Sequence, residues 1–207
     1  MSAADDPRRA LEEEMRRAGR LPPGQSASLK WPVLHVGPVP ELDPASWDFR
    51  IGGLVGSKLE LDWEDFQALP RAEVVSDFHC VTRWSTFDNR WEGVPARELL
   101  ARCRPRPEAS HAMLLGSAQG HRYGYSANLP LADLDRQDVL FALRRNGEPI
   151  PPEHGGPLRL VVPHLYAWKS VKWARGLVLM DADRPGYWEQ HGYHRRGDPF
   201  REQRFEG

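Results

Sequence analysis

The 207-residue chain has little of what several protein classes require. Its two cysteines are too few for the disulfide framework of a small secreted domain. Its formal net charge of −1 lacks the basic excess of a nucleic-acid-binding protein. No apolar run approaches the ~20 residues of a membrane span. With 40% hydrophobic and 28% charged residues, the composition is that of a globular protein, and we expect neither nucleic-acid binding nor a membrane span.

The N-terminal segment carries two adjacent arginines, Arg8 and Arg9, but not the rest of an export signal. A twin-arginine signal needs an apolar stretch after the arginine pair, whereas this sequence continues with Leu-Glu-Glu-Glu at residues 11–14. The two cysteines also suit a reducing compartment. We therefore predict a cytoplasmic protein.

The abundant residue types favour a fold rich in turns and strands. The chain has 18 glycines and 19 prolines, well above the usual share of about 12% for the two together, and eight tryptophans. Asp6-Pro7 is typical of a helix start, so residues 1–28 are interpreted as a helical arm and linker and 29–207 as one domain. The prediction is an α+β domain dominated by strands. Strands are expected at 47–54, 73–80, 113–115, 123–126, 139–143, 158–162 and 170–180, with a loop followed by a strand over 84–92. Short helices are expected at 63–69, capped by Asp62, and at 95–103. The strands at 113–115 and 123–126 are expected to pair around a turn at Gln119-Gly120, and Asn146-Gly147 is expected to form a tight turn.

Cys80 is the first candidate for chemistry, because it follows a predicted strand within the polar and aromatic segment FHCVTRWST. A thiolate there could ligate a soft metal or act as a nucleophile. The alternative is that Cys80 is a small buried apolar residue. Cys103 ends an apolar-faced helix, and we expect it to be structural.

Two basic segments are candidates for binding an anion. In HGGPLR, glycines allow close backbone approach, while His154 and Arg159 supply charge-assisted hydrogen bonds. The alternative is a turn that enters a strand, with Arg159 extended into solvent. In YAWKSVK, Lys169 and Lys172 cannot share one face of a regular strand, so one could point at a ligand while the other is solvated. The alternative there is an ordinary exposed strand edge. The histidines do not show the spacing of zinc ligands.

Taken in order, these segments resemble the molybdopterin domain of the sulfite oxidase superfamily. Its small bacterial sulfite oxidase-like branch, which includes the catalytic subunit of methionine-sulfoxide reductase, is the most similar. The resemblance covers about residues 31–188. It rests on PVP at 38–40, FHCVT followed by WS from Phe78, WEGVP from Trp91, HGGPLRLVVP from His154, and Tyr-x-x-Lys-Ser-Val-Lys from Tyr166.

The resemblance implies a molybdenum–molybdopterin cofactor (Mo-MPT) whose metal is ligated by the thiolate of Cys80. It also implies contacts to the cofactor at nine positions, which are Trp31, Leu34, His35, Ser117, His154, Arg159, Ser170, Val171 and Lys172. Leu34 and Val171 would contribute backbone groups. The cationic side chains of Arg159 and Lys172 suit an anionic phosphate.

The resemblance further implies an oxidoreductase that transfers an oxygen atom to or from a small-molecule oxide or oxyanion. Sulfite oxidases have arginine at two positions where this chain has Leu34 and Ser85, which favours an S- or N-oxide over sulfite. His79 and Arg83 are candidates for contacting the substrate. The chain has no room for a haem domain, so electrons are expected to come from, or go to, a separate donor or acceptor protein.

Two other functions stay open at the level of the sequence. The chain could bind or carry the cofactor without turnover. It could also be a metal-free thiol hydrolase, in which Cys80 acts with a histidine. The substrate, the direction of the reaction and the oligomeric state do not follow from the residues.

Overall fold

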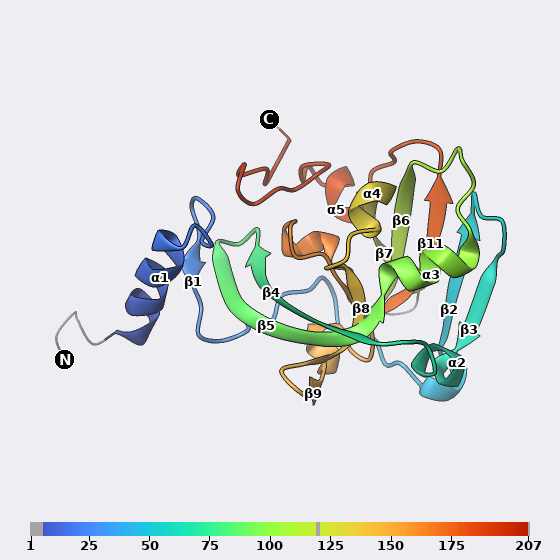
Figure 1. The fold of residues 1–207 in the computed structure, drawn as a ribbon, viewed down its shortest axis with the longest axis horizontal. Helices are drawn as coiled ribbons and strands as arrows, with labels where there is room; N and C mark the ends of the chain where they lie inside the picture. The colour runs from blue at the N-terminus through green and yellow to red at the C-terminus, as the bar shows by residue number, and fades with distance from the viewer. Residues whose placement is uncertain (1–5, 119–120, 207) are drawn as a thin grey trace.

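The computed structural model describes residues 6–118 and 121–206, and within them the strands form two sheets (Figure 1). The helices are α1 (Pro7–Arg17), α2 (Trp63–Gln67), α3 (Ala96–Cys103), α4 (Leu131–Leu134) and α5 (Tyr187–Gln190). The strands are β1 (Ser26–Ala27), β2 (Asp48–Gly53), β3 (Leu59–Asp62), β4 (Ala72–Cys80), β5 (Trp84–Pro95), β6 (His111–Ala118), β7 (His121–Pro130), β8 (Leu140–Arg145), β9 (Glu148–Pro149), β10 (Arg159–Val161) and β11 (Ala174–Met180).

The first sheet is built on the long, curved strand β5. Its strand order is β1-β5-β8-β10, with β4 paired to β5 and β9 paired to β8. The second sheet has the order β3-β2-β11-β6-β7. In each sheet one pair is parallel, β1 with β5 and β11 with β2, and the other pairs are antiparallel. The predicted α+β domain, rich in strands and with short helices, is confirmed.

The main core packs apolar side chains of the second sheet against α2, α3 and β8. Phe49 of β2 lies with its ring centroid 5.2 Å from that of Phe66 of α2 and 5.0 Å from that of Phe141 of β8. A smaller apolar cluster, which includes Phe78, Trp91 and Val161, lies between β4, β5, β8 and β10. This second cluster supports the end of β4, where Cys80 is located.

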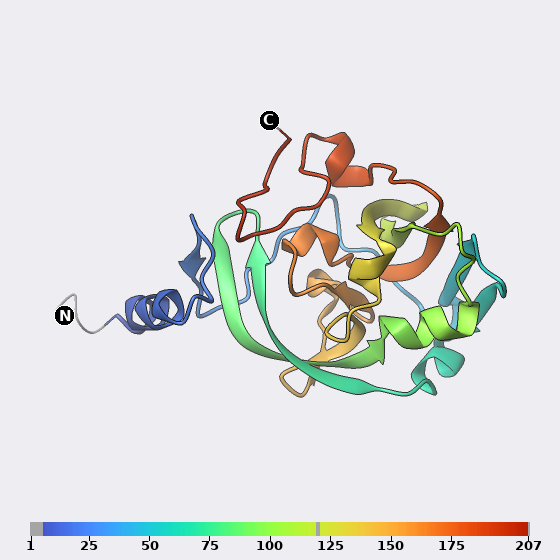
Figure 2. The ribbon, with the colours of Figure 1, turned by 45° about the horizontal axis from the view of Figure 1, so that its top comes forward.

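The N-terminal arm follows the local signals of the sequence. The Asp6 side chain accepts a hydrogen bond from the Arg8 backbone N–H at 3.0 Å and caps α1. In both views α1 lies at one end of the molecule and β2 and β3 at the other (Figures 1 and 2). Ser26 and Ala27, in the expected linker, pair with β5. No helix in the described ranges is long and apolar enough to cross a membrane.

Three local expectations differ from the structure or fall outside it. The strand expected over residues 170–180 begins only at Ala174, because Ala167–Lys169 forms a 3-10 helix and the chain turns before β11. Residues 84–95 form one strand instead of a loop followed by a strand. Strands β6 and β7 pair as predicted, while the predicted turn at Gln119-Gly120 lies outside the described residues.

Candidate functional site

A cavity of about 410 Å³ brings together segments that are distant in the sequence. Its wall comes from residues 31–38, from the turn after β4, from β6 and β7, from residues 154–173, and from the C-terminal segment around α5. The volume lies within the range of small-molecule and cofactor sites. Among the described lining residues there is no aspartate or glutamate. The cavity therefore offers cationic, aromatic and thiol groups but no acid.

Cys80 ends β4, and its side chain is part of the cavity wall. Its Sγ lies 3.2 Å from Thr82 Oγ1, and its backbone carbonyl accepts hydrogen bonds from Gln25 Nε2 at 2.9 Å and from the Arg83 N–H at 3.1 Å. Burial raises the pKa of the thiol, although Thr82 and the charges of Lys172 and Arg159 oppose the shift. A bound metal cation would favour the thiolate.

The hydrolase alternative requires a base beside this thiol. Among the described residues, Cys80 Sγ has its side-chain hydrogen bond with Thr82 and none with a histidine. Since burial also favours the neutral thiol, the arrangement gives no support to a thiol nucleophile activated by a neighbouring base.

Arg159 is a buried cation that faces the cavity. Its residue is 2% exposed, and its guanidinium donates to His154 O at 2.6 Å and to Ser170 O at 3.1 Å. Nε has no hydrogen-bond partner, and within the described ranges no carboxylate forms an ion pair with the guanidinium. Burial lowers the Arg159 pKa to about 10. The alternative in which Arg159 extends into solvent is therefore wrong.

Lys172 lies in the same part of the cavity wall. Its Nζ donates to Leu34 O and to Glu153 O, both at 2.8 Å, and so attaches residues 31–38 to the rest of the wall. Burial and the nearby charge of Arg159 lower the Lys172 pKa to about 7. Two cations that share an acid-free cavity make a site for an anion, which would relieve their repulsion and desolvation.

A flat surface of stacked rings lies beside these cations. The rings of Trp31 and His154 stack with centroids 3.8 Å apart and an interplanar angle of 8°. The guanidinium of Arg145 lies 4.3 Å from the Trp31 ring centroid. Burial, followed by the charges of Lys172 and Arg159, lowers the His154 pKa to about 4, so His154 is neutral near pH 7.

The structure brings most of the expected cofactor-binding residues together. Seven of the nine line the cavity, namely Trp31, Leu34, His35, His154, Arg159, Ser170 and Lys172. Ser117 and Val171 do not, although Ala118, Ser170 and Lys172 beside them in the sequence do. Val171 packs into the main core, and its carbonyl accepts a hydrogen bond from the Leu160 N–H at 2.8 Å. The roles of all nine residues in binding stay predictions.

His79 and Arg83, the expected substrate contacts, lie outside the cavity lining. Because side chains alternate along β4, His79 points away from Cys80, and its Nδ1 lies 2.9 Å from Ser85 Oγ. Burial lowers the His79 pKa to about 4. Arg83 is exposed in the turn, at φ 72°. Ser85 is fully buried beside His79 and does not line the cavity either.

Sequence reasoning missed the aromatic wall of the cavity, by which we mean Tyr125, Trp168, Trp188 and Tyr193. The available signal was the density of aromatic residues between positions 187 and 193.

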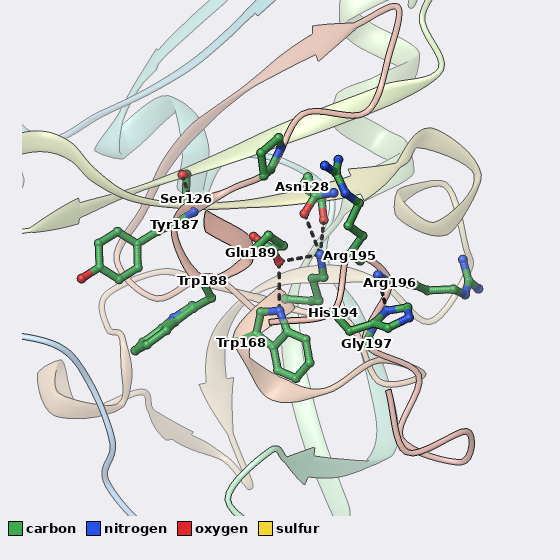
Figure 3. A network of polar contacts seen from close by, with 12 residues as sticks. Ser126, Asn128, Trp168, Tyr187, Trp188, Glu189, His194, Arg195, Arg196 and Gly197 are labelled. Atoms are coloured by element: carbon green, nitrogen blue, oxygen red, sulfur yellow. Dashed lines mark hydrogen bonds and ion pairs between the residues drawn. The ribbon is translucent and has the colours of Figure 1, made fainter. Parts of the chain in front are cut away.

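Sequence reasoning also misplaced Lys169, because exposure to solvent was one of the two expectations for its side chain. Lys169 is 0% exposed and pairs with Glu189, which also accepts a hydrogen bond from the Trp168 indole (Figure 3). Cys103 is buried in the main core, as predicted.

Comparison with known proteins identifies relatives of this chain. The family described as "Oxidoreductase molybdopterin binding domain" matches residues 36–188. The uncharacterized oxidoreductase YuiH of Bacillus subtilis (strain 168) is 45% identical over 190 residues, which cover 91% of this chain and 93% of YuiH. The protein-methionine-sulfoxide reductase catalytic subunit MsrP of Gluconobacter oxydans (strain 621H) is 30% identical, and the match covers 75% of this chain and 55% of MsrP.

More distant similarity extends to larger proteins. Mitochondrial sulfite oxidase of Rattus norvegicus is 28% identical, with 75% of this chain and 33% of that protein covered. The crystal structure of the sulfane dehydrogenase SoxCD from Paracoccus pantotrophus superimposes with a TM-score of 0.63 at 25% identity, over 74% of this chain and 42% of that one. The chain thus spans nearly all of YuiH, but only about half of MsrP and a third of sulfite oxidase.

Proposed function

The chain belongs to the oxidoreductase molybdopterin-binding domain family and is a molybdopterin-dependent oxidoreductase, and on that premise we propose that it removes an oxygen atom from a neutral organic S- or N-oxide. Each turnover would consume two electrons and two protons and release the deoxygenated compound and water. The electrons would come from a separate donor protein.

The cavity has the chemistry that Mo-MPT needs. Arg159, with its unpaired Nε, supplies buried positive charge for the cofactor phosphate, and the partly buried Lys172, whose pKa is about 7, would be held in its charged form by that phosphate. In the part of the chain that the structure describes, no three histidine, cysteine, aspartate or glutamate residues form a cluster that could hold a metal. This suits a metal that is held mainly by its organic cofactor, with one protein ligand. The bound cofactor supplies a molybdenum ion that exchanges two electrons and an oxygen atom.

The residues of the chain would then act by binding and orientation. Cys80 would ligate the metal through its thiolate, Arg159 and Lys172 would hold the phosphate, and the stacked rings of Trp31 and His154 would provide a flat contact for the cofactor. Lys172 also attaches residues 31–38 through Leu34 O, so that this segment closes the cavity on one side.

The distribution of charge in the cavity is the observation that favours a neutral oxide over sulfite as the substrate. A sulfite dianion beside the metal would need positive charge in addition to the charge that the cofactor phosphate uses. Leu34, at one of the two positions that are arginine in sulfite oxidases, provides none, while Arg83 and Ser85 lie outside the lining. The aromatic wall, which lines the same cavity as Cys80, instead suits an uncharged compound with an apolar substituent.

A steady-state assay with a reduced dye as electron donor tests this function. We expect turnover of methyl phenyl sulfoxide or trimethylamine N-oxide, and we expect Cys80→Ser to abolish it. Sulfite is assayed in the opposite direction with an oxidised dye. Sulfite oxidation well above oxide reduction would show that an anion site exists and that the proposal is wrong. We also propose that the protein is located in the cytoplasm, which the free thiols of Cys80 and Cys103 support.

A further inference from the structure

A buried ion pair lies behind the cavity wall, and the chemistry proposed above does not use it. Lys169, at the end of the 3-10 helix, has its Nζ 2.6 Å from Oε1 of Glu189 on α5. The same Nζ donates to Asn128 of β7, at 2.7 Å to Oδ1 and 3.0 Å to the carbonyl, and to the carbonyl of Arg195. Figure 3 shows Asn128, Glu189 and Arg195 close together, with dashed lines for hydrogen bonds and ion pairs between the residues drawn.

The ion pair is joined to the aromatic wall by hydrogen bonds. Glu189 Oε1 accepts a hydrogen bond from Trp168 Nε1 at 2.9 Å. The Trp168 backbone carbonyl accepts from Tyr125 OH at 3.1 Å, and that hydroxyl in turn accepts from Trp188 Nε1 at 2.9 Å. Glu189 and Trp188 are adjacent residues of α5. The three hydrogen bonds therefore connect Glu189, and through it Lys169, to Trp168, Tyr125 and Trp188, which are three of the four residues of the wall.

The fourth ring of the wall, Tyr193, packs against two of the others. The Tyr193 ring centroid lies 5.1 Å from that of Trp168 and 4.9 Å from that of Trp188. Tyr193 and Cys80 both line the cavity. A shift of Trp168 would therefore change the shape of the cavity that the expected metal ligand also lines.

Stability alone is a poor explanation for this ion pair. Removing both charges from water costs free energy that their attraction only partly returns, and apolar residues of similar volume usually stabilise a protein as well or better. Burial indeed lowers the Lys169 pKa, although the charge of Glu189 opposes the shift. Unlike apolar packing, the ion pair can fix the orientation of a neighbouring side chain. The Glu189 carboxylate places a hydrogen-bond acceptor at one side of the Trp168 indole.

We propose that Glu189, whose buried charge is balanced by Lys169, is a positioning residue that sets the orientation of Trp168, so that the aromatic wall binds the apolar substituent of the substrate. The substrate class is then an oxide that carries an aromatic or similarly bulky apolar group. The identity of the substrate as an oxide rests on the proposed function.

Two double variants separate the positioning role from the electrostatic one. Lys169→Met/Glu189→Gln and Lys169→Met/Glu189→Leu both remove the ion pair without leaving a buried unpaired charge. Only the glutamine variant keeps a side-chain oxygen that can accept the Trp168 indole N–H. Arg196→Met is the control, because it removes the ion pair of the same C-terminal segment with Asp133 but leaves Glu189 in place.

The experiment uses the full-length, cofactor-loaded protein. Binding of methyl phenyl sulfoxide and of dimethyl sulfoxide is followed by tryptophan fluorescence, with KM, kcat, molybdenum content and melting temperature measured on the same samples. We expect the glutamine variant and Arg196→Met to bind methyl phenyl sulfoxide as the unmodified protein does. The leucine variant should bind it roughly two- to tenfold more weakly, the effect of one lost hydrogen bond, with kcat and molybdenum content unchanged. Dimethyl sulfoxide should lose less affinity.

Equal affinities of the two double variants would overturn the inference, even if their melting temperatures differ. An equal loss for both sulfoxides would also overturn it, and so would the absence of any fluorescence response in the unmodified protein. If the unmodified protein binds methyl phenyl sulfoxide but reduces neither sulfoxide nor N-oxide, the proposed function fails. The affinities of the two double variants for methyl phenyl sulfoxide would then still test whether Glu189 positions Trp168.

Discussion

Arg159→Met should leave the protein folded but weaken its binding of Mo-MPT. The guanidinium of Arg159 is buried in the cavity wall without a carboxylate partner in the described ranges, and its Nε makes no hydrogen bond. We expect this charge to face the cofactor phosphate. Methionine keeps an unbranched, adaptable side chain and removes only the charge and the donors.

The expected loss of affinity follows from one charge-assisted hydrogen bond, about 1.5–3 kcal/mol, or roughly 10- to 150-fold in the dissociation constant. Two opposed effects act on the cofactor-free protein. Burial lowers the Arg159 pKa to about 10, so removing the charge relieves a cost on the order of 3 kcal/mol. The carbonyls of His154 and Ser170 lose their donors, which costs about 1–3 kcal/mol each. The cofactor-free variant should therefore be destabilised by about 3 kcal/mol at most.

Cofactor content and thermal stability together measure this prediction. Molybdenum and pterin per chain should fall in Arg159→Met, and the rise in melting temperature on loading should shrink by roughly 3–12 °C. Arg145→Met is the matched control, because this cation contacts the Trp31 ring and Asn89 but does not line the cavity. Normal content with an unchanged rise in Arg159→Met, or an equal loss in Arg145→Met, would refute the reasoning.

Three further predictions concern single side chains. Cys80→Ser should keep the fold and lose activity, since a hydroxyl donates far less charge to a metal than a thiolate. Cys103→Ser should stay active, and its free energy of unfolding in urea should fall by about 1 kcal/mol. An active Cys80→Ser enzyme would contradict the ligand assignment. Lys172→Met should release residues 31–38 from the Leu34 O contact, so trypsin should cleave faster after Lys30, and an unchanged cleavage rate would argue against this attachment. The His154 pKa is about 4 in the folded protein, against an ordinary value of 6.5, so below pH 6.5 the unfolded state binds a proton that the folded state does not. His154 should then contribute a loss of stability of up to about 1.4 kcal/mol per pH unit as the pH falls from 6.5 to 4, in addition to the contribution of His79, and no change above pH 7. Urea titrations in which His154→Gln shows the same acid slope as the unmodified protein would contradict this.

Short-range interactions explain which parts of the fold could be predicted. The Asp6 and Asp62 side chains cap the helices that follow them, at the predicted residues. The Asn146-Gly147 turn connects β8 and β9 as expected, with both residues at positive φ. In each case the deciding contact lies within a few residues of the signal, so that a local pattern is sufficient.

The ordered motifs of the sequence likewise identified the family, Cys80 and most of the cationic residues of the cavity. What the motifs could not supply was the direction of each side chain. The family resemblance marked Ser85 as a position near the substrate, yet the alternation of β4 and β5 places it with His79, away from Cys80. A shift of one residue along a strand reverses the face, and the loose motif does not specify that register.

By itself, the sequence determined the strand-rich α+β fold, the family, and the residue types gathered around Cys80. Only the tertiary structure decided that Lys172 lines the cavity while Lys169 is buried behind it, and that the C-terminal segment supplies part of the aromatic wall. The physical reason is that Lys169 is held by Asn128, Glu189 and Arg195, which lie 20 to 41 residues away along the chain. Such partners leave no trace in the local pattern around either lysine, because they come together only when the sheets and the C-terminal segment have packed.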